Sequence, residues 1–217
     1  MATRLAARVD DRMLRMMLAP TIRDLGTDDL SAAVDVVARG MRDNPLNIAA
    51  FGDDAGVRLE RLQGMFTIAL PMILRKGVLL GAFDDQTLLG VAALVPPGRC
   101  QASTREKVAM LPRMVWAIGL GGLGRVVRWQ AAWSQRDLRA PHWHLGPVAV
   151  DTHLQGQGVG SALMKTYCAR IDRVGAAGYL ETDKPQNVDF YKRFGFETVG
   201  EAPVLGTANW FMRRMQA

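Results

Sequence analysis

The sequence is short of the features that mark secreted and membrane proteins. Its 217 residues include only two cysteines, Cys100 and Cys168, which lie far apart and form no C-x-x-C pair. Reduced thiols in a cytoplasm are therefore the simplest expectation, and no secretory signal precedes them. The longest apolar stretch, residues 114–124, is far below the roughly 20 residues that a membrane span needs. These absences predict a soluble cytoplasmic protein without a membrane partner.

Two further kinds of pattern are missing. The chain has no G-x-S-x-G nucleophile elbow and no evident Cys-His pair, which argues against covalent nucleophilic catalysis. Its 27 basic residues exceed its 21 acidic ones, giving a net charge of +6. No nucleic-acid motif accompanies this charge, so no nucleic-acid partner is predicted.

The length of the chain predicts one domain, and a proline near the start predicts that a short N-terminal arm precedes this domain. A chain of 217 residues buries about 70% of its unfolded surface, which is enough for one full core. Residues 1–20 carry arginines at helical spacing, but Asp10 and Asp11 argue against an organelle transit peptide. We expect a short helix or arm there, ended by Pro20, and a single domain over residues 21–217. The arginines are Arg4, Arg8, Arg12 and Arg15.

A glycine-rich turn stands between an apolar strand and an amphipathic helix. Residues 155–160 read Gln-Gly-Gln-Gly-Val-Gly, and apolar residues then recur at helical spacing until Gly175. The first amides of a helix have no intrahelical partner and lie at the positive end of its dipole. Glycines let a ligand approach the backbone closely, so the turn predicts an anion site. The apolar residues of the helix are Ala162, Leu163, Tyr167, Ile171 and Val174.

The spacing of this turn excludes two of the three families of glycine-rich loops. A G-x-G-x-x-G dinucleotide fingerprint needs its last glycine where Ser161 or Leu163 stands. A P-loop needs Gly-Lys-Ser/Thr where the chain has Gly160-Ser161-Ala162. What remains is the pattern Q-x-x-G-x-G, which starts at Gln155.

A second motif follows at residues 179–196. Residues 179–183 read as a short strand that Pro185 ends, and Asn187 is the expected N-cap of a helix. Phe190 and Phe194 pair at i and i+4 before Gly195 stops the helix. The segment therefore predicts a strand followed by a short helix.

Together the two motifs resemble the GCN5-related N-acetyltransferase (GNAT) family. That family carries Q/R-x-x-G-x-G/A between a strand and a helix, where it cradles the coenzyme A pyrophosphate, and then N-x-x-x-x-Y/F-Y-x-x-x-G-F or a near variant. This chain keeps Asn187, Tyr191 and the pair Gly195-Phe196. The residues of these motifs are most similar to those of the small-molecule acetyltransferases around puromycin acetyltransferase. Motif-level resemblance covers residues 142–200.

The rest of the pattern agrees with the fold that the resemblance implies. This fold is α/β, with a mixed, mostly antiparallel central sheet, flanking helices and a helical insertion between strands 3 and 4, at residues 99–139. The expected strands cover about residues 21–25, 78–84, 88–95, 142–150, 179–183, 197–204 and 208–214. The expected helices cover about residues 30–39, 57–75, 159–174 and 187–194.

The resemblance implies acetyl-CoA as the cofactor and names the residues that hold it. After Gly146-Pro147 the family's strand splays from its neighbour, which leaves backbone amides for the pantetheine arm, while the amides of the turn hold the pyrophosphate. The asparagine of the second motif would bond the pantetheine or its ordered water. The expected cofactor-binding residues are Val148, Ala149, Val150, Gln155, Gly156, Gln157, Gly158, Val159, Gly160, Ser161 and Asn187.

Acetyl transfer to an amine also needs proton transfers. An alkylammonium is only about 0.1% free base at pH 7, so a base is useful. His144 is the first candidate, because imidazole accepts a proton near neutral pH and the residue stands where arylalkylamine acetyltransferases carry a histidine. Glu181 and a water relay are the alternatives. For the acid, the resemblance places the hydroxyl of Tyr191 beside the coenzyme sulfur.

Two histidines that share one face of an expected strand raise the hypothesis of a metal site. His142 and His144 form a His-x-His pair, and imidazole is a common metal ligand. No third ligand is evident in the sequence, so no metal site is predicted.

The acceptor stays open at this point. The resemblance favours direct transfer to a primary amine of a small molecule, but a protein amino group and a non-catalytic acyl-CoA-binding regulatory module are alternatives. The insertion, with eight basic and two acidic residues, fits a coenzyme-attracting lid, a nucleic-acid contact or a solvated helix face. Its tryptophans Trp116, Trp129 and Trp133 fit an acceptor pocket, a core or a dimer contact. A homodimer is also open.

Overall fold

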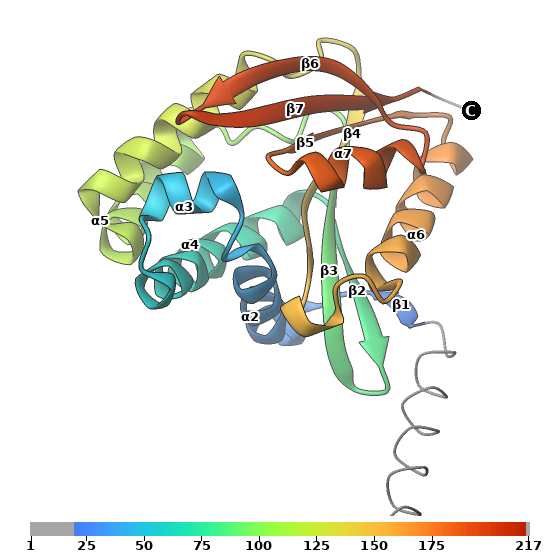
Figure 1. The fold of residues 1–217 in the computed structure, drawn as a ribbon, viewed down its shortest axis with the longest axis horizontal. Coiled ribbons are helices and arrows are strands. Elements are labelled where there is room, and N and C mark those ends of the chain that lie inside the picture. Colours follow the sequence, from blue (N-terminus) through green and yellow to red (C-terminus); the bar gives the residue numbers. More distant parts are fainter. Residues whose placement is uncertain (1–19, 216–217) are drawn as a thin grey trace, which may run out of the picture.

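The computed structural model describes residues 20–215, which form a seven-stranded sheet with helices on both faces (Figure 1). The predicted N-terminal arm, apart from Pro20, lies outside these residues. Among the helices of this described part, none combines the length and the hydrophobicity needed to cross a membrane.

The strands lie in the order β1-β2-β3-β4-β5-β7-β6. All neighbouring pairs are antiparallel except β4 and β5, which run parallel. The mostly antiparallel sheet is therefore confirmed, and each predicted strand is present close to its expected bounds. The strands are β1 (Thr21–Asp24), β2 (Val78–Asp84), β3 (Thr87–Val95), β4 (His142–Val150), β5 (Ala177–Thr182), β6 (Glu197–Val204) and β7 (Thr207–Arg214).

Two hydrophobic cores lie on opposite faces of the sheet. Because successive side chains of a strand alternate between faces, Leu79 packs into one core and its neighbour Leu80 into the other. The first face is covered by α2 (Leu30–Met41), α3 (Pro45–Phe51), α4 (Ala55–Lys76) and α5 (Thr104–Ser134). The second is covered by α6 (Val159–Arg173) and α7 (Pro185–Lys192), drawn in orange in Figure 1.

Two helices differ from the expectation. The sequence pattern does not predict α3, because seven residues are too few to display an apolar stripe; Pro45 at its first position is the local signal. Helix α7 begins at Pro185 with Lys184 as its N-cap. The prediction that Asn187 caps this helix is therefore wrong, since a proline in the first turn had already started it.

Helix α5 is the predicted helical insertion between β3 and β4. It breaks at Gly119, whose φ of 69° is outside the helical region. It packs closely on α4 at Gly64, where an added Cβ would lie 2.9 Å from the Cβ of Ala117. Gly64 thus lets α4 and α5 approach each other, and together these helices wall one side of a cavity that residues of both helices line.

Candidate active site

Strands β4 and β5 separate partway along their length. Their parallel pairing ends at His144 and Tyr179. Beyond this point β4 continues beside β3 to Val150, whereas β5 continues beside β7 to Thr182. The sheet therefore opens between its two central strands.

A bulge at Gly146-Pro147 turns the two halves of β4 to opposite faces. The β3–β4 register shifts at this point, and an odd shift reverses which face a side chain takes. His144, before the bulge, lines the cavity walled by α4 and α5, whereas Val148 and Val150 pack with the core under α6. One strand thus serves both sides of the opening.

The same register decides which amides of β4 are free. The N–H of Asp151 donates to the carbonyl of Leu89 at 3.0 Å, and bonded and non-bonded pairs alternate along antiparallel strands. Val148 and Val150 therefore lie in non-bonded pairs with β3, so their N–H groups point away from β3, into the gap where β5 no longer pairs with β4. Ala149 lies in a bonded pair, so its amide is part of the sheet and is not free for a coenzyme.

The glycine-rich turn enters α6 with its backbone open. Gly156 and Gly158 have φ angles of 78° and 90°, and a Cβ added at either would meet nothing within 4 Å. Gly158 is the N-cap of α6 and offers no side-chain cap. Because the first helical hydrogen bond comes from Ala162, the N–H groups of residues 159–161 have no intrahelical partner. This arrangement fits an anion such as a pyrophosphate.

Two residues expected in this cradle instead hold the turn in shape. The backbone N–H groups of Gln155 and Gln157 donate to the carbonyls of Thr152 and Leu154, just before the turn. The side-chain amide of Gln155 donates to the carbonyl of Val150 at 3.1 Å, and that of Gln157 to the carbonyl of His153 at 2.8 Å. The amides left for an anion are those of Gly156, Gly158, Val159, Gly160 and Ser161.

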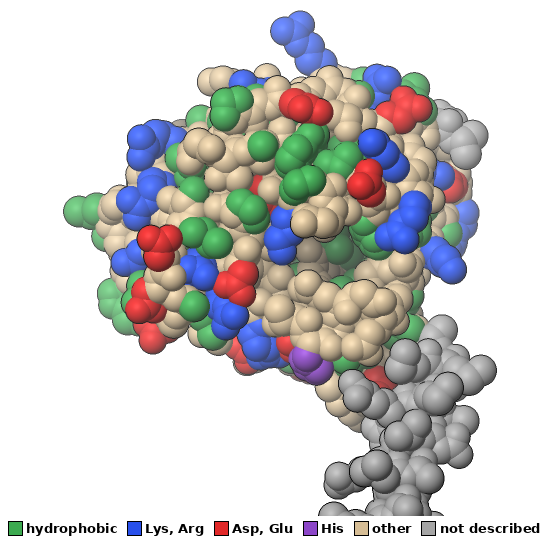
Figure 2. Space-filling model, in the orientation of Figure 1, with side chains coloured by type: hydrophobic (Ala, Val, Ile, Leu, Met, Phe, Trp, Pro, Cys, Tyr) green, Lys and Arg blue, Asp and Glu red, His purple; other side chains and the backbone are tan. Residues whose placement is uncertain are grey.

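A cavity of about 690 Å³ lies where β4 and β5 part. It extends from Met65 of α4 on one face of the sheet to Tyr191 of α7 on the other, so it passes between the two strands. The surface is also hollowed between α7 and the turn that precedes α6, as Figure 2 shows. The cavity brings together five of the residues expected from the sequence: His144, Val148, Glu181, Asn187 and Tyr191.

The helical wall of the cavity is largely apolar. Trp129 and Trp133 line it with their rings in edge-to-face contact, 5.1 Å between centroids, whereas Trp116 is exposed on α5. Two of the three tryptophans thus line the cavity, as the acceptor-pocket interpretation of the sequence expects. The wall also holds flexible thioether side chains, which adapt to varied shapes. They are Met41, Met65, Met72, Met110 and Met114.

Tyr191 lies buried at the end of the cavity. Within the described part of the chain its hydroxyl has no hydrogen-bond partner, and its ring packs edge-on against Phe190 and Phe196. Burial raises the pKa of Tyr191, and the charge of Asp183 adds to this. The hydroxyl therefore stays protonated at neutral pH and can donate a proton.

His144 and Glu181 form a buried pair beside the cavity. Nε2 of His144 lies 3.1 Å from Oε2 of Glu181, whose side chain is 3% exposed. Burial by itself lowers the pKa of His144, but the charge of Glu181 and its hydrogen bond outweigh this, so the pKa is raised. The pair can accept a proton, since the carboxylate stabilises the imidazolium that results.

Three residues that the sequence did not single out also lie here. Asp183, the residue after β5, accepts a hydrogen bond of 2.7 Å from the N–H of Leu46, and burial raises its pKa. Asp137 and Cys100 lie beside His142, where Oδ1 of Asp137 is 3.0 Å from Nε2 of the imidazole. Burial lowers the pKa of His142, but contact with Asp137 overrides this and raises it to about 10. No spacing signals the group, because α5 separates its members in sequence.

Residues 67–196 match the model of the acetyltransferase (GNAT) family. A solved structure described as histone acetyltransferase HPA2 and related acetyltransferase, from Corynebacterium glutamicum, aligns with a TM-score of 0.72 at 24% identity, over 92% of this chain and 98% of that one. A GNAT acetyltransferase from Brucella melitensis in complex with acetyl-CoA aligns with a TM-score of 0.51 at 18% identity, over 91% and 88%. The PaiA N-acetyltransferase from Thermoplasma acidophilum in complex with coenzyme A gives 0.56 at 13%, over 91% and 99%. At these identities the likeness is one of fold.

Proposed function

This chain belongs to the GNAT acetyltransferase family, and we propose that it transfers an acetyl group from acetyl-CoA directly to a primary amine of a small molecule. The observation that carries the proposal is the opening between β4 and β5, through which a partly open cavity passes and beyond which β4 leads into the glycine-rich turn. A coenzyme and an acceptor bound from the two sides would meet at Tyr191 and His144.

The backbone around the opening suits the coenzyme. The amides of Gly156, Gly158 and the first turn of α6 would hold the pyrophosphate. The N–H groups of Val148 and Val150, which face away from β3, would bond the pantetheine arm and polarise the thioester carbonyl. Two family structures hold acetyl-CoA and coenzyme A, which supports the choice of coenzyme. When bound, acetyl-CoA supplies an activated acyl group as a thioester.

The side chains at the opening suit the proton transfers. His144, backed by Glu181, accepts the proton that the ammonium of the acceptor must lose before it can attack. Tyr191, kept neutral by burial, donates a proton to the departing thiolate. The base and the acid reach the opening from opposite faces of the sheet, which supports their serving the acceptor and the coenzyme respectively.

The cavity supports a small, partly apolar amine as the acceptor. Its volume of about 690 Å³ lies within the range of small-molecule sites. Glu181 and Asp183 present carboxyl groups at one end, which suits an ammonium, and the methionines and tryptophans suit an apolar body. The resemblance to puromycin-acetyltransferase-like motifs points to the same substrate class.

The test is release of coenzyme A thiol from acetyl-CoA over a panel of amines and peptides with free amino termini. We expect turnover with one class of small amine, and a fall of about 100-fold or more in Tyr191→Phe. Calorimetry should find the same coenzyme affinity in both proteins, since the variant removes only a hydroxyl. Turnover with peptides alone would replace the small-molecule acceptor by a protein one.

The rival is a coenzyme-binding regulatory module. It predicts that acetyl-CoA raises the melting temperature while no amine in the panel is acetylated and Tyr191→Phe changes nothing. The pairing of His144 with Glu181 favours the enzyme, because a module that only binds the coenzyme has no need of a buried base.

A further inference from the structure

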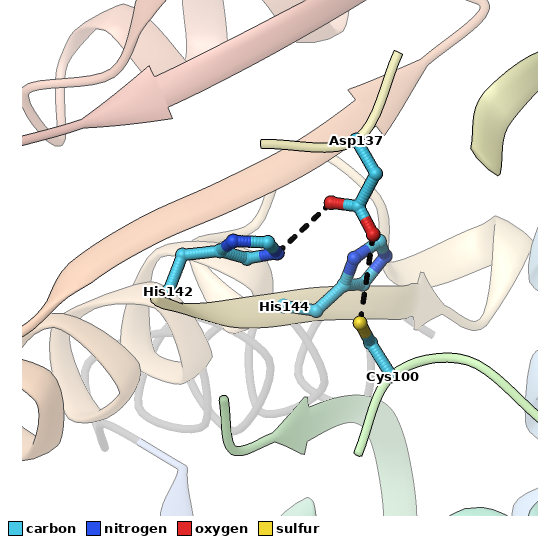
Figure 3. A group of neighbouring side chains, drawn as sticks. All are labelled: Cys100, Asp137, His142 and His144. Carbon is cyan, nitrogen blue, oxygen red and sulfur yellow. Dashed lines mark hydrogen bonds and ion pairs between the residues drawn. The ribbon is translucent and has the colours of Figure 1, made fainter. Parts of the chain in front are cut away.

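Four side chains with metal-binding atoms meet at the start of β4, as Figure 3 shows. Cys100 lies on the segment between β3 and α5, Asp137 on the segment that follows α5, and His142 and His144 on β4 itself. One ligand atom of each residue lies within 4.8 Å of those of the other three. The cluster is thus assembled from three separate segments of the chain.

Three atoms of this cluster are buried without a hydrogen-bond partner among the described residues. They are Oδ1 of Asp137, Nε2 of His142 and Nδ1 of His144. Although Oδ1 and Nε2 lie 3.0 Å apart, they are not aligned as a hydrogen bond. Buried polar groups in native proteins nearly always have a partner. Three such atoms in one cluster therefore indicate a shared partner.

Each imidazole is already held through its other nitrogen. Nδ1 of His142 lies 2.9 Å from the carbonyl oxygen of Ala140, which can only accept, so this nitrogen carries the proton. Nε2 of His144 lies 3.1 Å from the carboxylate of Glu181. Metal-binding histidines typically show such a carbonyl or carboxylate partner, which fixes the tautomer and turns the free lone pair toward the ion.

We propose that Cys100, Asp137, His142 and His144 bind one Zn²⁺ ion or a similar divalent transition metal. A thiolate, two imidazoles and a carboxylate form a four-ligand set that zinc accepts in tetrahedral geometry. The thiolate and the carboxylate together balance the two positive charges. The soft sulfur and the two imidazoles exclude Mg²⁺ and Ca²⁺, which prefer oxygen ligands.

The present separations exceed those of a tetrahedral site by no more than about 1.5 Å. Ligands at bond lengths of roughly 2.0–2.3 Å from a tetrahedral ion lie about 3.3–3.8 Å from one another. Sγ of Cys100 is already 3.5 Å from Oδ2 of Asp137. The remaining pairs need to contract by no more than about 1.5 Å from the 4.8 Å limit. Side-chain rotations of this size leave the backbone in place.

A metal-free ion pair explains less of the geometry. A protonated His142 facing Asp137 accounts for that one contact. It leaves Nδ1 of His144 buried and unpartnered, and it leaves the thiol of Cys100 with only a long hydrogen bond of 3.5 Å to Oδ2 of Asp137. The metal accounts for all of these together.

A bound ion would join both ends of α5 to the sheet. Cys100 precedes the helix and Asp137 follows it, and the hydroxyl of Tyr179 already donates to the carbonyl of Arg136 at 3.0 Å, which holds the returning segment in place. Because α5 walls the cavity, the ion would stiffen that wall. It would also occupy the free nitrogen of His144, which leaves Glu181 as the proton acceptor in the loaded protein.

The test is metal binding to the full chain without a histidine tag, after treatment with a chelator. Zn²⁺ titrated by calorimetry should bind one ion per chain, and Co²⁺ should show the visible bands of a tetrahedral site with a sulfur-to-cobalt charge-transfer band in the near ultraviolet. Because even indirect supports of a metal site change its affinity by 10–100-fold, loss of a ligand in Cys100→Ser or His142→Ala should weaken Zn²⁺ binding by at least about 100-fold.

The chain offers matched controls in its other cysteine and its third histidine. Cys168→Ser and His153→Ala should bind Zn²⁺ like the parent, since both residues lie outside the cluster. Cys100→Ser changes one atom and should keep the parent circular dichroism spectrum while losing the charge-transfer band. Absence of stoichiometric Zn²⁺ binding in the parent, or a charge-transfer band that survives in Cys100→Ser and disappears in Cys168→Ser, would overturn the proposal.

Discussion

The carboxylate of Asp183, the residue after β5, accepts a hydrogen bond of 2.7 Å from the backbone N–H of Leu46 in the first turn of α3. The two residues stand 137 positions apart in the sequence, and both are buried. The bond therefore ties α3 to the centre of the sheet, at the edge of the cavity proposed to hold the acceptor.

Asp183→Ala should lower the free energy of unfolding by about 1–3 kcal/mol, because it leaves the N–H of Leu46 buried without a partner. Urea denaturation measures this loss. Asp183→Asn is the matched control, since its amide oxygen can still accept the bond, and it should stay close to the parent. Equal stability of the alanine variant and the parent would show that the bond does not hold α3.

Glu181→Gln should move the pH profile of turnover toward acid. The charge of Glu181 outweighs burial and raises the pKa of His144, so the parent gains activity only as pH rises through that raised value. Without the carboxylate the histidine loses its proton at lower pH. We expect the rising limb of kcat/KM to shift to lower pH, measured in the presence of a chelator. An unmoved limb would remove His144 from the role of base.

Gly158→Ala should weaken coenzyme binding by tenfold or more, because the new methyl group points into the open space in front of the turn. The substitution also strains a residue whose φ is 90°, at about 1–2 kcal/mol. Gly206→Ala controls for the strain alone, since Gly206 has a φ of 79°, equally open surroundings and a place in the β6–β7 turn. Calorimetry with acetyl-CoA should separate the two variants; similar losses in both would refute the cradle.

Arg39→Met should break an ion pair with Asp151 and destabilise the protein at pH 7. Because the arginine is partly exposed, the loss should be only about 1 kcal/mol. Arg39 donates two hydrogen bonds to Asp151, the residue after β4. Burial raises the pKa of Asp151, but the contact with Arg39 overrides this, so the pKa is lowered from 3.8. A lowered carboxyl pKa contributes stability above the unfolded value and loses it as pH falls through the folded value.

The difference between Arg39→Met and the parent should therefore be full at pH 7 and shrink below about pH 4. Unfolding measured across this range is the test. Arg105→Met, at an exposed position of α5, removes an equal charge and should show no such pH-dependent gap. A gap that stays constant down to low pH would mean that the loss comes from packing.

Much of the fold could be predicted because it depends on local patterns. The strand at residues 142–150 and the turn before α6 follow from hydrophobic alternation and from glycine spacing, which neighbouring residues alone specify. Helix α3 could not be predicted, because a seven-residue helix is stabilised mainly by contacts with residues far along the chain, such as that of Leu46 with Asp183.

The candidate site likewise has a part that the sequence predicts and a part that it does not. Spacing and family motifs pointed to Gly158, Tyr191, His144 and Glu181, and the structure brings the last three to one cavity. The use of Gln155 and Gln157 inside the turn, and the engagement of the Ala149 amide in the sheet, could not be predicted. Strand register and side-chain direction decide which donors are free, and both are set by the whole sheet.

By itself, then, the sequence determined the order of the elements and the family, because hydrophobic period, turn chemistry and motif spacing act over a few residues at a time. Only the tertiary structure decided which distant groups meet. It paired His144 with Glu181 across two strands, and it brought Cys100 and Asp137 to the histidines from the two ends of α5. Such meetings depend on the register of the sheet and on the path of a helix, which no spacing along the chain records.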